Sequence, residues 1–171
     1  MNKKIFIRII LIIMIIINCA TIFKFSSQES EKSSGVSGTV VTKIVETNPK
    51  TRNLKNEEKE KIKEQITTPI RKTAHFTIYT CLGALLFLCA NTFETTSKKK
   101  YATSFTLGAI YACTDEIHQK FVSGRSCELR DVGIDSLGVI FGICLAMGIT
   151  KLGSIIFKKN KFHNIEKSVE K

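Results

Sequence analysis

Residues 111–135 read YACTDEIHQKFVSGRSCELRDVGID and connect two apolar segments of the chain. Ionisable and amide side chains are dense in this stretch: Asp115, Glu116, His118, Gln119, Lys120, Arg125, Glu128, Arg130, Asp131 and Asp135. Charged groups next to hydrocarbon are costly and rare, and where they occur they usually mark function. If the two apolar segments cross a membrane, the stretch between them indicates a working site at the membrane boundary.

The charge pattern of the whole chain is that of a membrane protein. The formal net charge of the 171 residues is +11, which in a soluble protein would suggest nucleic-acid binding. Here, however, the apolar residues fall in long blocks and the lysines fall between them. Basic flanks around apolar blocks are typical of membrane spans, so we expect the lipid bilayer, and no nucleic acid, as a partner.

Four segments have the composition of transmembrane helices: residues 5–23, 73–93, 102–119 and 132–152. A helix rises about 1.5 Å per residue, so about 20 residues cross the hydrocarbon. A cleavable signal peptide is the alternative for the first segment, but its apolar run is long and no clear A-x-A site follows it. We therefore predict an all-α, polytopic membrane bundle of about four transmembrane helices, with the first helix retained.

The polar segment after the first span is predicted to form surface helices. Residues 40–45 have apolar side chains at helical spacing, and Asn48-Pro49 ends this pattern. Residues 53–66 read as a second, highly charged helix with a thin apolar edge. Such an edge is typical of a helix that lies on the bilayer surface, separate from the spans.

The positive-inside rule orients the predicted spans. Basic residues precede the first span at 3–8, separate the second from the third at 98–100, and follow the fourth at 158–161. Four spans place these clusters on one side, so both termini are expected to be cytoplasmic. The chain then divides into a first transmembrane helix (1–23), an extracytoplasmic loop with amphipathic helices (24–70), a core of three transmembrane helices (71–152) and a basic cytoplasmic tail (153–171).

This topology brings polar groups from three helix ends together at the outer surface. Asp115 is expected to share a helix face with His118 and Gln119, while Glu116 is expected to point elsewhere, toward Lys120. Four residues of the last span fall along one face of the helix: Asp131, Asp135, Gly138 and Gly142. This face is polar at the outer end of the span and has no side chains at the two glycines further in. Its G-x-x-x-G pair allows another helix to approach closely.

Two kinds of chemistry suit such a cluster. Carboxylates beside histidines can transfer protons, and arginine forks can hold the oxygens of a phosphate. We predict the catalytic residues Asp115, Glu116, His118, His75, Asp131 and Asp135, and the substrate-binding residues Arg71, Lys72, Gln119, Arg125 and Arg130.

Two alternatives remain open for the same residues. Ion pairs, such as Arg71 with Asp131 or Arg130 with Asp115, would merely lock the helix ends together. A divalent-metal site would use Asp115, His118, His75 and Asp135. Because D-E-I-H does not match the H-E-x-x-H zinc pattern, we expect neither a metal nor another cofactor.

The motifs around these residues resemble the VanZ-like family of small bacterial membrane proteins. The matching segments are Arg71-Lys72-Thr73-Ala74-His75-Phe76 with Tyr79 and Leu82-Gly83, Asp115-Glu116-Ile117-His118-Gln119-Lys120-Phe121, Gly124-Arg125-Ser126, Arg130-Asp131-Val132 with Asp135-Ser136-Leu137-Gly138, and Phe25-Ser26-Ser27-Gln28. The family takes its name from a member that lowers susceptibility to the glycopeptide antibiotic teicoplanin. The resemblance implies a cell-envelope protein but carries over no catalytic residues.

The expected function is therefore to bind or modify an anionic envelope lipid or cell-wall precursor at the outer face of the bacterial cytoplasmic membrane. The alternative is a non-catalytic structural or assembly protein. Whether the protein is an enzyme, and its oligomeric state, stay open.

Overall fold

The computed structural model describes residues 2–27, 36–123 and 128–169, and side chains as far as residue 156. Its helices are α1 (Lys3–Ser26), α2 (Val36–Thr47), α3 (Asn56–Asn91), α4 (Ser97–Gln119) and α5 (Leu129–Val169). None of the described residues forms a strand, and the predicted all-α class is confirmed.

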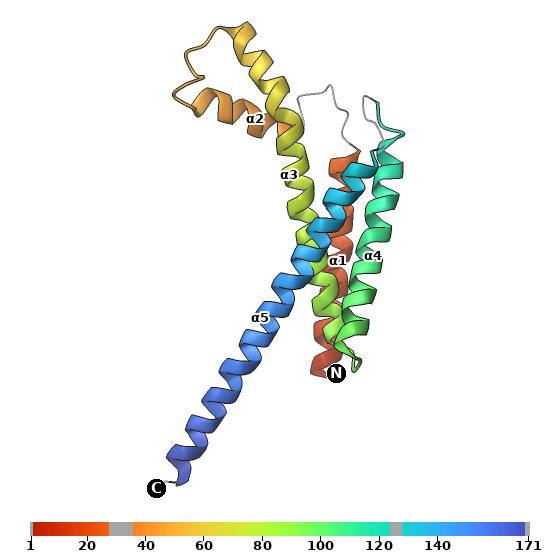
Figure 1. Cartoon of the computed structure of the whole chain (residues 1–171), viewed down its shortest axis with the longest axis vertical. Helices are drawn as coiled ribbons and strands as arrows, with labels where there is room; N and C mark the ends of the chain where they lie inside the picture. The colour runs from red at the N-terminus through yellow and green to blue at the C-terminus, as the bar shows by residue number, and fades with distance from the viewer. Residues whose placement is uncertain (1, 28–35, 124–127, 170–171) are drawn as a thin grey trace.

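The long helices form an up-down bundle around α3 (Figure 1). The start of α1 and the α3–α4 turn lie at one end, which we call the basal end (residues 2–8 and 89–100). The end of α1, the end of α4 and the start of α5 lie at the other end, beside the middle of α3 (Figure 1). We call this the apical end (residues 23–27, 71–79, 115–119 and 128–135).

Three helices are long and apolar enough to cross a membrane: Lys3–Ser26, Asn56–Asn91 and Leu129–Ile156. Helix α4 is not among them, although its 23 residues give it a suitable length. Its buried face holds polar and small side chains: Ser104, Gly108, Ala112, Asp115, Glu116 and Gln119. These polar side chains lower the hydropathy of α4, so a count of four spans stays a prediction.

The segment predicted as a charged helix at residues 53–66 is helical from Asn56 on, but it is not a helix of its own, because α3 runs without interruption from Asn56 to Asn91 through Pro69. A proline inside a helix loses one hydrogen bond and costs about 3 kcal/mol. Packing on both sides of Pro69 offsets this cost, since α2 packs against α3 and buries Val41 and Val45. The predicted boundary between an outer loop and the core at residue 70 therefore falls inside one helix.

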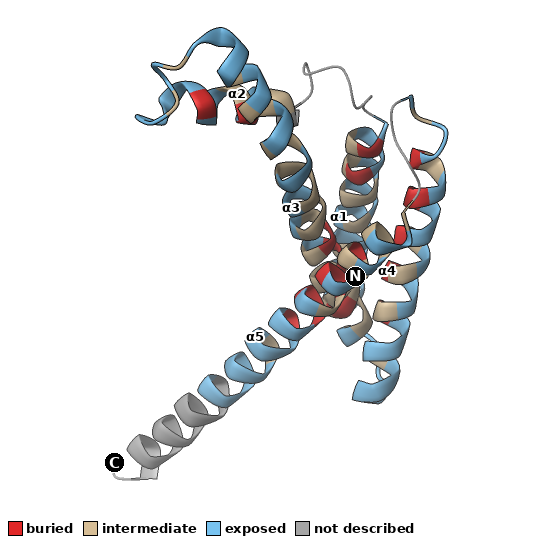
Figure 2. Ribbon diagram, turned by 45° about the horizontal axis from the view of Figure 1, so that its top comes forward, coloured by how far each residue is buried: buried red, intermediate tan, exposed pale blue. Residues whose placement is uncertain are grey.

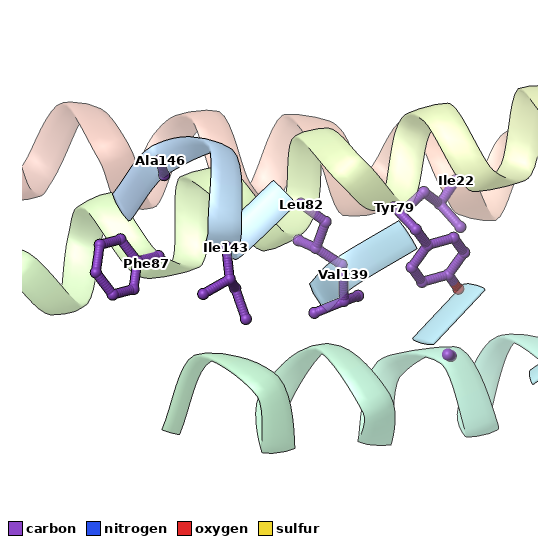
Figure 3. Close-up of a cluster of buried hydrophobic side chains, with 8 residues drawn as sticks. Ile22, Tyr79, Leu82, Phe87, Val139, Ile143 and Ala146 are labelled. Atoms are coloured by element: carbon purple, nitrogen blue, oxygen red, sulfur yellow. The ribbon is translucent and has the colours of Figure 1, made fainter. Parts of the chain in front are cut away.

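The crossing of α3 and α5 forms the core. Buried side chains gather where these helices meet (Figure 2), and the largest include Tyr79, Leu82 and Ile143 (Figure 3). A Cβ on Gly138 would lie 2.7 Å from the carbonyl oxygen of Phe76, and one on Gly142 would overlap a carbonyl oxygen of α3. The prediction that this G-x-x-x-G pair allows close helix approach is confirmed.

Polar contacts tie the basal end together. Lys4 forms an ion pair of 2.9 Å with Glu94, and this contact lowers the pKa of the Glu94 carboxyl. The guanidinium of Arg8 donates to the hydroxyl of Thr92 at 3.0 Å and to its carbonyl at 3.1 Å. It also lies 3.7 Å from the ring centroid of Phe93. These contacts fix the start of α1 on the α3–α4 turn.

Candidate functional site

A cleft opens at the apical end, between α3, α4 and α5. Including its open mouth it encloses about 260 Å³. It is lined by Arg71, Lys72, His75, Glu116, Gln119, Asp131, Ile134 and Asp135. Apart from Ile134, all of these residues belong to the predicted site, so the structure brings most of that site together.

Lys72 connects α3 to the start of α5. Its Nζ donates a hydrogen bond to Oδ1 of Asp131 and lies 3.7 Å from a carboxylate oxygen of Glu128. The predicted pair of Arg71 with Asp131 is therefore wrong, since the neighbouring lysine makes this contact. Successive residues on a helix lie about 100° apart, so the rotation of α3 decides which cation meets α5.

His75 stands one turn further along α3 and faces Asp135 of α5. Its Nδ1 lies 3.7 Å from Oδ2 of Asp135, and both side chains are largely buried. The distance is that of an ion pair and is too long for a hydrogen bond. The prediction that Arg71 and His75 share one face is confirmed, because both line the cleft.

Asp115 is held by neighbours on two helices. Its Oδ2 accepts a hydrogen bond of 2.7 Å from the hydroxyl of Ser26 and one of 3.2 Å from the amide of Gln119. Ser26 is fully buried and absent from the predicted site, although the family-like motif at residues 25–28 contains it. A hydroxyl at the last turn of an otherwise apolar span is the signal that would have found it.

Glu116 faces into the bundle, so the prediction that it points away toward Lys120 is wrong. It lines the cleft, its Oε1 accepts a hydrogen bond of 2.7 Å from the backbone N–H of Glu128, and its buried Oε2 has no partner. The buried face of α4 includes residues at positions i, i+3, i+4 and i+7, from Ala112 to Gln119. Glu116 is the i+4 member of that series.

His118 lies outside the cleft, on the side of α4 that faces α1. Its ring stacks on Phe23 with centroids 4.4 Å apart, and its Nε2 lies 3.1 Å from the hydroxyl of Ser27. The predicted shared face of Asp115 and Gln119 is confirmed by their hydrogen bond, whereas His118 does not line the cleft that Gln119 lines. Its predicted catalytic role stays a prediction.

The three predicted arginines are placed differently. Arg71 lines the cleft and forms no ion pair or hydrogen bond with any other side chain that the structure describes. Arg130 is exposed and lies 3.6 Å from Glu128, so its predicted pairing with Asp115 is wrong. Arg125 lies outside the described residues.

The buried carboxylates at this site outnumber the basic side chains beside them. Asp115, Glu116 and Asp135 are 4%, 1% and 2% exposed. Among the described side chains, the cationic partner of these three within 4.0 Å is His75, against Asp135. A buried charge without a partner is expensive, so the site is suited to a ligand or proton that compensates the carboxylates.

The sequence profile of the VanZ/LLP1 family matches residues 9–153, which is most of the chain. The chain belongs to the VanZ/LLP1 family. The matched region covers about three quarters of α1, all of α2, α3 and α4, and the first part of α5, including every residue that lines the cleft. Together with the three candidate spans, membership in the VanZ/LLP1 family identifies a membrane protein. Neither a curated protein nor a solved structure matches the chain.

Proposed function

We propose that the apical cleft binds, or chemically alters, an anionic envelope lipid or cell-wall precursor at the outer face of the bacterial cytoplasmic membrane. Arg71 is the observation that carries the proposal. It is a half-buried cation that lines the cleft, and among the described residues no carboxylate neutralises it. A guanidinium in this position can donate two parallel hydrogen bonds to a phosphate or carboxylate of a ligand.

The arrangement of basic residues supports the orientation. Lys4 and Arg8 lie at the basal end with the lysines at 98–100, and the positive-inside rule assigns that end to the cytoplasm. The cleft lies at the opposite end of the bundle, and so on the outer side. A lipid headgroup at the end of the spans would meet Arg71 without leaving the membrane interface.

The residues opposite Arg71 support chemistry as well as binding. His75 lies between this arginine and Asp135, where it can donate a hydrogen bond or transfer a proton to a bound group. Asp115 and Glu116 would orient the histidine and the ligand. By family name, a change in envelope composition would alter susceptibility to teicoplanin.

Replacing Arg71 with glutamine tests the proposal, and Arg52→Gln is a matched control because Arg52 is exposed in the α2–α3 connection. The purified full chain is placed in phosphatidylcholine nanodiscs that contain phosphatidylglycerol, and retained lipids are measured by native mass spectrometry. We expect the wild type and Arg52→Gln to retain phosphatidylglycerol preferentially, and Arg71→Gln to lose this preference. Equal retention by all three proteins would contradict the proposal.

A second experiment separates catalysis from binding and from assembly. The Asp115→Asn variant is expressed in cells, and its membrane level is compared with the profile of lipids and cell-wall precursors. An enzyme loses its effect on the profile at normal protein level, whereas a binding protein changes no lipid. A structural protein shows a lower membrane level.

The structural alternative is favoured by one contact. Lys72 joins α3 to Asp131 of α5 directly, as a helix lock would. If the lock is the whole function, Asp131→Asn lowers membrane abundance while Arg71→Gln has no effect on any readout.

A further inference from the structure

Three side chains from three helices converge below the mouth of the cleft. His75 of α3, Asp115 of α4 and Asp135 of α5 each offer a nitrogen or oxygen atom, and these atoms all lie within 4.8 Å of one another. Ligands bound at about 2.1 Å to one ion lie roughly 3–4.2 Å apart, depending on the coordination geometry. The separations between these atoms would therefore have to shorten by up to about 1.8 Å for the three side chains to share an ion.

The surroundings favour a cation at this point. The two aspartates are buried with Glu116, and among the described residues no lysine or arginine lies within 4.0 Å of these carboxylates. Their ionisable neighbour is His75, 3.7 Å from Asp135. Lys72 is engaged by Asp131. A divalent cation would compensate the excess negative charge that the fold buries here.

A second observation comes from Tyr79, one turn beyond His75 on α3. Its hydroxyl is fully buried, and no described residue lies at hydrogen-bonding distance and angle from it. The nearby charged groups are the carboxyls of Asp115 and Asp135. Figure 3 shows this hydroxyl on the side of the ring that faces α4. An unused donor of this kind suits a ligating carboxylate, or a water on an ion, because metal sites orient their ligands with such outer groups.

We propose that His75, Asp115 and Asp135 bind one divalent first-row transition-metal ion, with Tyr79 as a positioning residue. An imidazole with two carboxylates suits Mn²⁺ or Zn²⁺, whereas Ca²⁺ prefers oxygen ligands alone. Ser26 and Gln119 fix Asp115 through Oδ2, which leaves its Oδ1 for the ion. The site stands on this geometry alone and does not require that the cleft bind an anion.

Direct metal binding tests this inference. The full chain is purified in detergent, stripped with a chelator and titrated with Mn²⁺, and free Mn²⁺ is followed by electron paramagnetic resonance. We expect one saturable site per chain. His75→Gln, Asp115→Asn and Asp135→Asn should each weaken it at least tenfold, and Tyr79→Phe should weaken it less.

The chain offers matched controls for the carboxylate ligands. Glu94→Gln replaces a carboxylate at the basal end, and Glu46→Gln replaces an exposed carboxylate on α2. Both should bind Mn²⁺ as the wild type does. Zn²⁺ should displace Mn²⁺ from the wild-type site, whereas displacement by Ca²⁺ alone would exclude His75 as a ligand and overturn the assignment.

Folding is checked separately, by size-exclusion chromatography and by thermal unfolding with and without metal. Mn²⁺ should raise the unfolding temperature of the wild type and leave that of a folded Asp135→Asn variant unchanged. The proposal would be overturned if the wild-type protein has no saturable Mn²⁺ site. It would also be overturned if all three ligand variants bind Mn²⁺ as tightly as the wild type does. Lipid retention in the nanodisc experiment has no bearing on either outcome, so the two proposals fail independently.

Discussion

The charged side chains at the two ends of the bundle differ in their exposure and in their partners. At the basal end the charged side chains are exposed or half-buried, and those that hold the helix ends have partners: Lys4 pairs with Glu94, and Arg8 contacts Thr92 and the ring of Phe93. At the apical end the carboxylates of Asp115, Glu116 and Asp135 are buried. One carboxylate oxygen and one tyrosine hydroxyl there have no hydrogen-bond partner.

This difference distinguishes contacts that only position helices from the side chains of a candidate functional site. An exposed ion pair contributes at most about 1 kcal/mol and costs little to form, so it can serve only to position helices. Buried carboxylates without partners destabilise the fold, and a chain retains them where a ligand, proton or ion uses them. We therefore infer that the basal end holds the helices together, whereas the apical end is suited to the proposed function.

The largest expected effect comes from separating the helices on which the apical site depends. Gly142→Leu places a side chain against the backbone of α3 at Thr80, whereas Gly148 has open space around it. We expect Gly142→Leu to cost about 1–3 kcal/mol or more, and Gly148→Leu to cost little. Thermal unfolding in detergent and membrane abundance measure this difference; equal unfolding temperatures would show that the crossing does not support the site.

Removing the central basal cation should have the next largest effect. Arg8→Ala loses two hydrogen bonds to Thr92 and the contact with Phe93, for a cost of about 1–2 kcal/mol. Lys3→Ala, which removes an exposed cation in the first turn of the same helix, is the control and should be neutral. The apical functions of an Arg8→Ala protein that still folds should be unchanged, and their loss would mean that the two ends are not independent.

Neutralising a carboxylate at the apical end should have a small effect of the opposite sign on stability. In metal-free buffer, Asp135→Asn removes a buried charge at nearly constant volume, so we expect the free energy of unfolding to stay constant or to rise by up to about 1 kcal/mol. Urea or thermal unfolding measures this change. A large loss of stability would indicate that Asp135 is part of a lock after all.

The smallest effect is expected at the exposed basal pair. Because Lys4 lowers the pKa of Glu94, the contact stabilises the folded protein above the ordinary glutamate pKa of about 4.3 and is lost as pH falls through the lowered value. Glu94→Gln should therefore lower the unfolding temperature no more than slightly, and equally, between about pH 5 and pH 7, and should have no effect below the lowered pKa. A clear shift in that range would mean that the pair contributes more than its exposure suggests.

The sequence by itself determined the helices and the residues that gather at one end. Long apolar runs, the Asn48-Pro49 break and the G-x-x-x-G pair are local patterns, and each is found where it was predicted. Most of the predicted site residues also meet in the cleft, because helix direction and span order place their helix ends at one level. The predicted span at residues 102–119 stays a prediction, because α4 carries polar side chains on its buried face and is not among the three helices apolar enough to cross a membrane.

Only the tertiary structure decided which of two adjacent residues on a helix makes a given contact with the neighbouring helices. It selected Lys72 over Arg71 as the partner of Asp131, turned Glu116 inward and placed His118 against α1. It also joined the charged segment before Pro69 to the span after it. The physical reason is that adjacent residues point about 100° apart, so a small rotation of a packed helix exchanges their roles, and that rotation is set by contacts between helices.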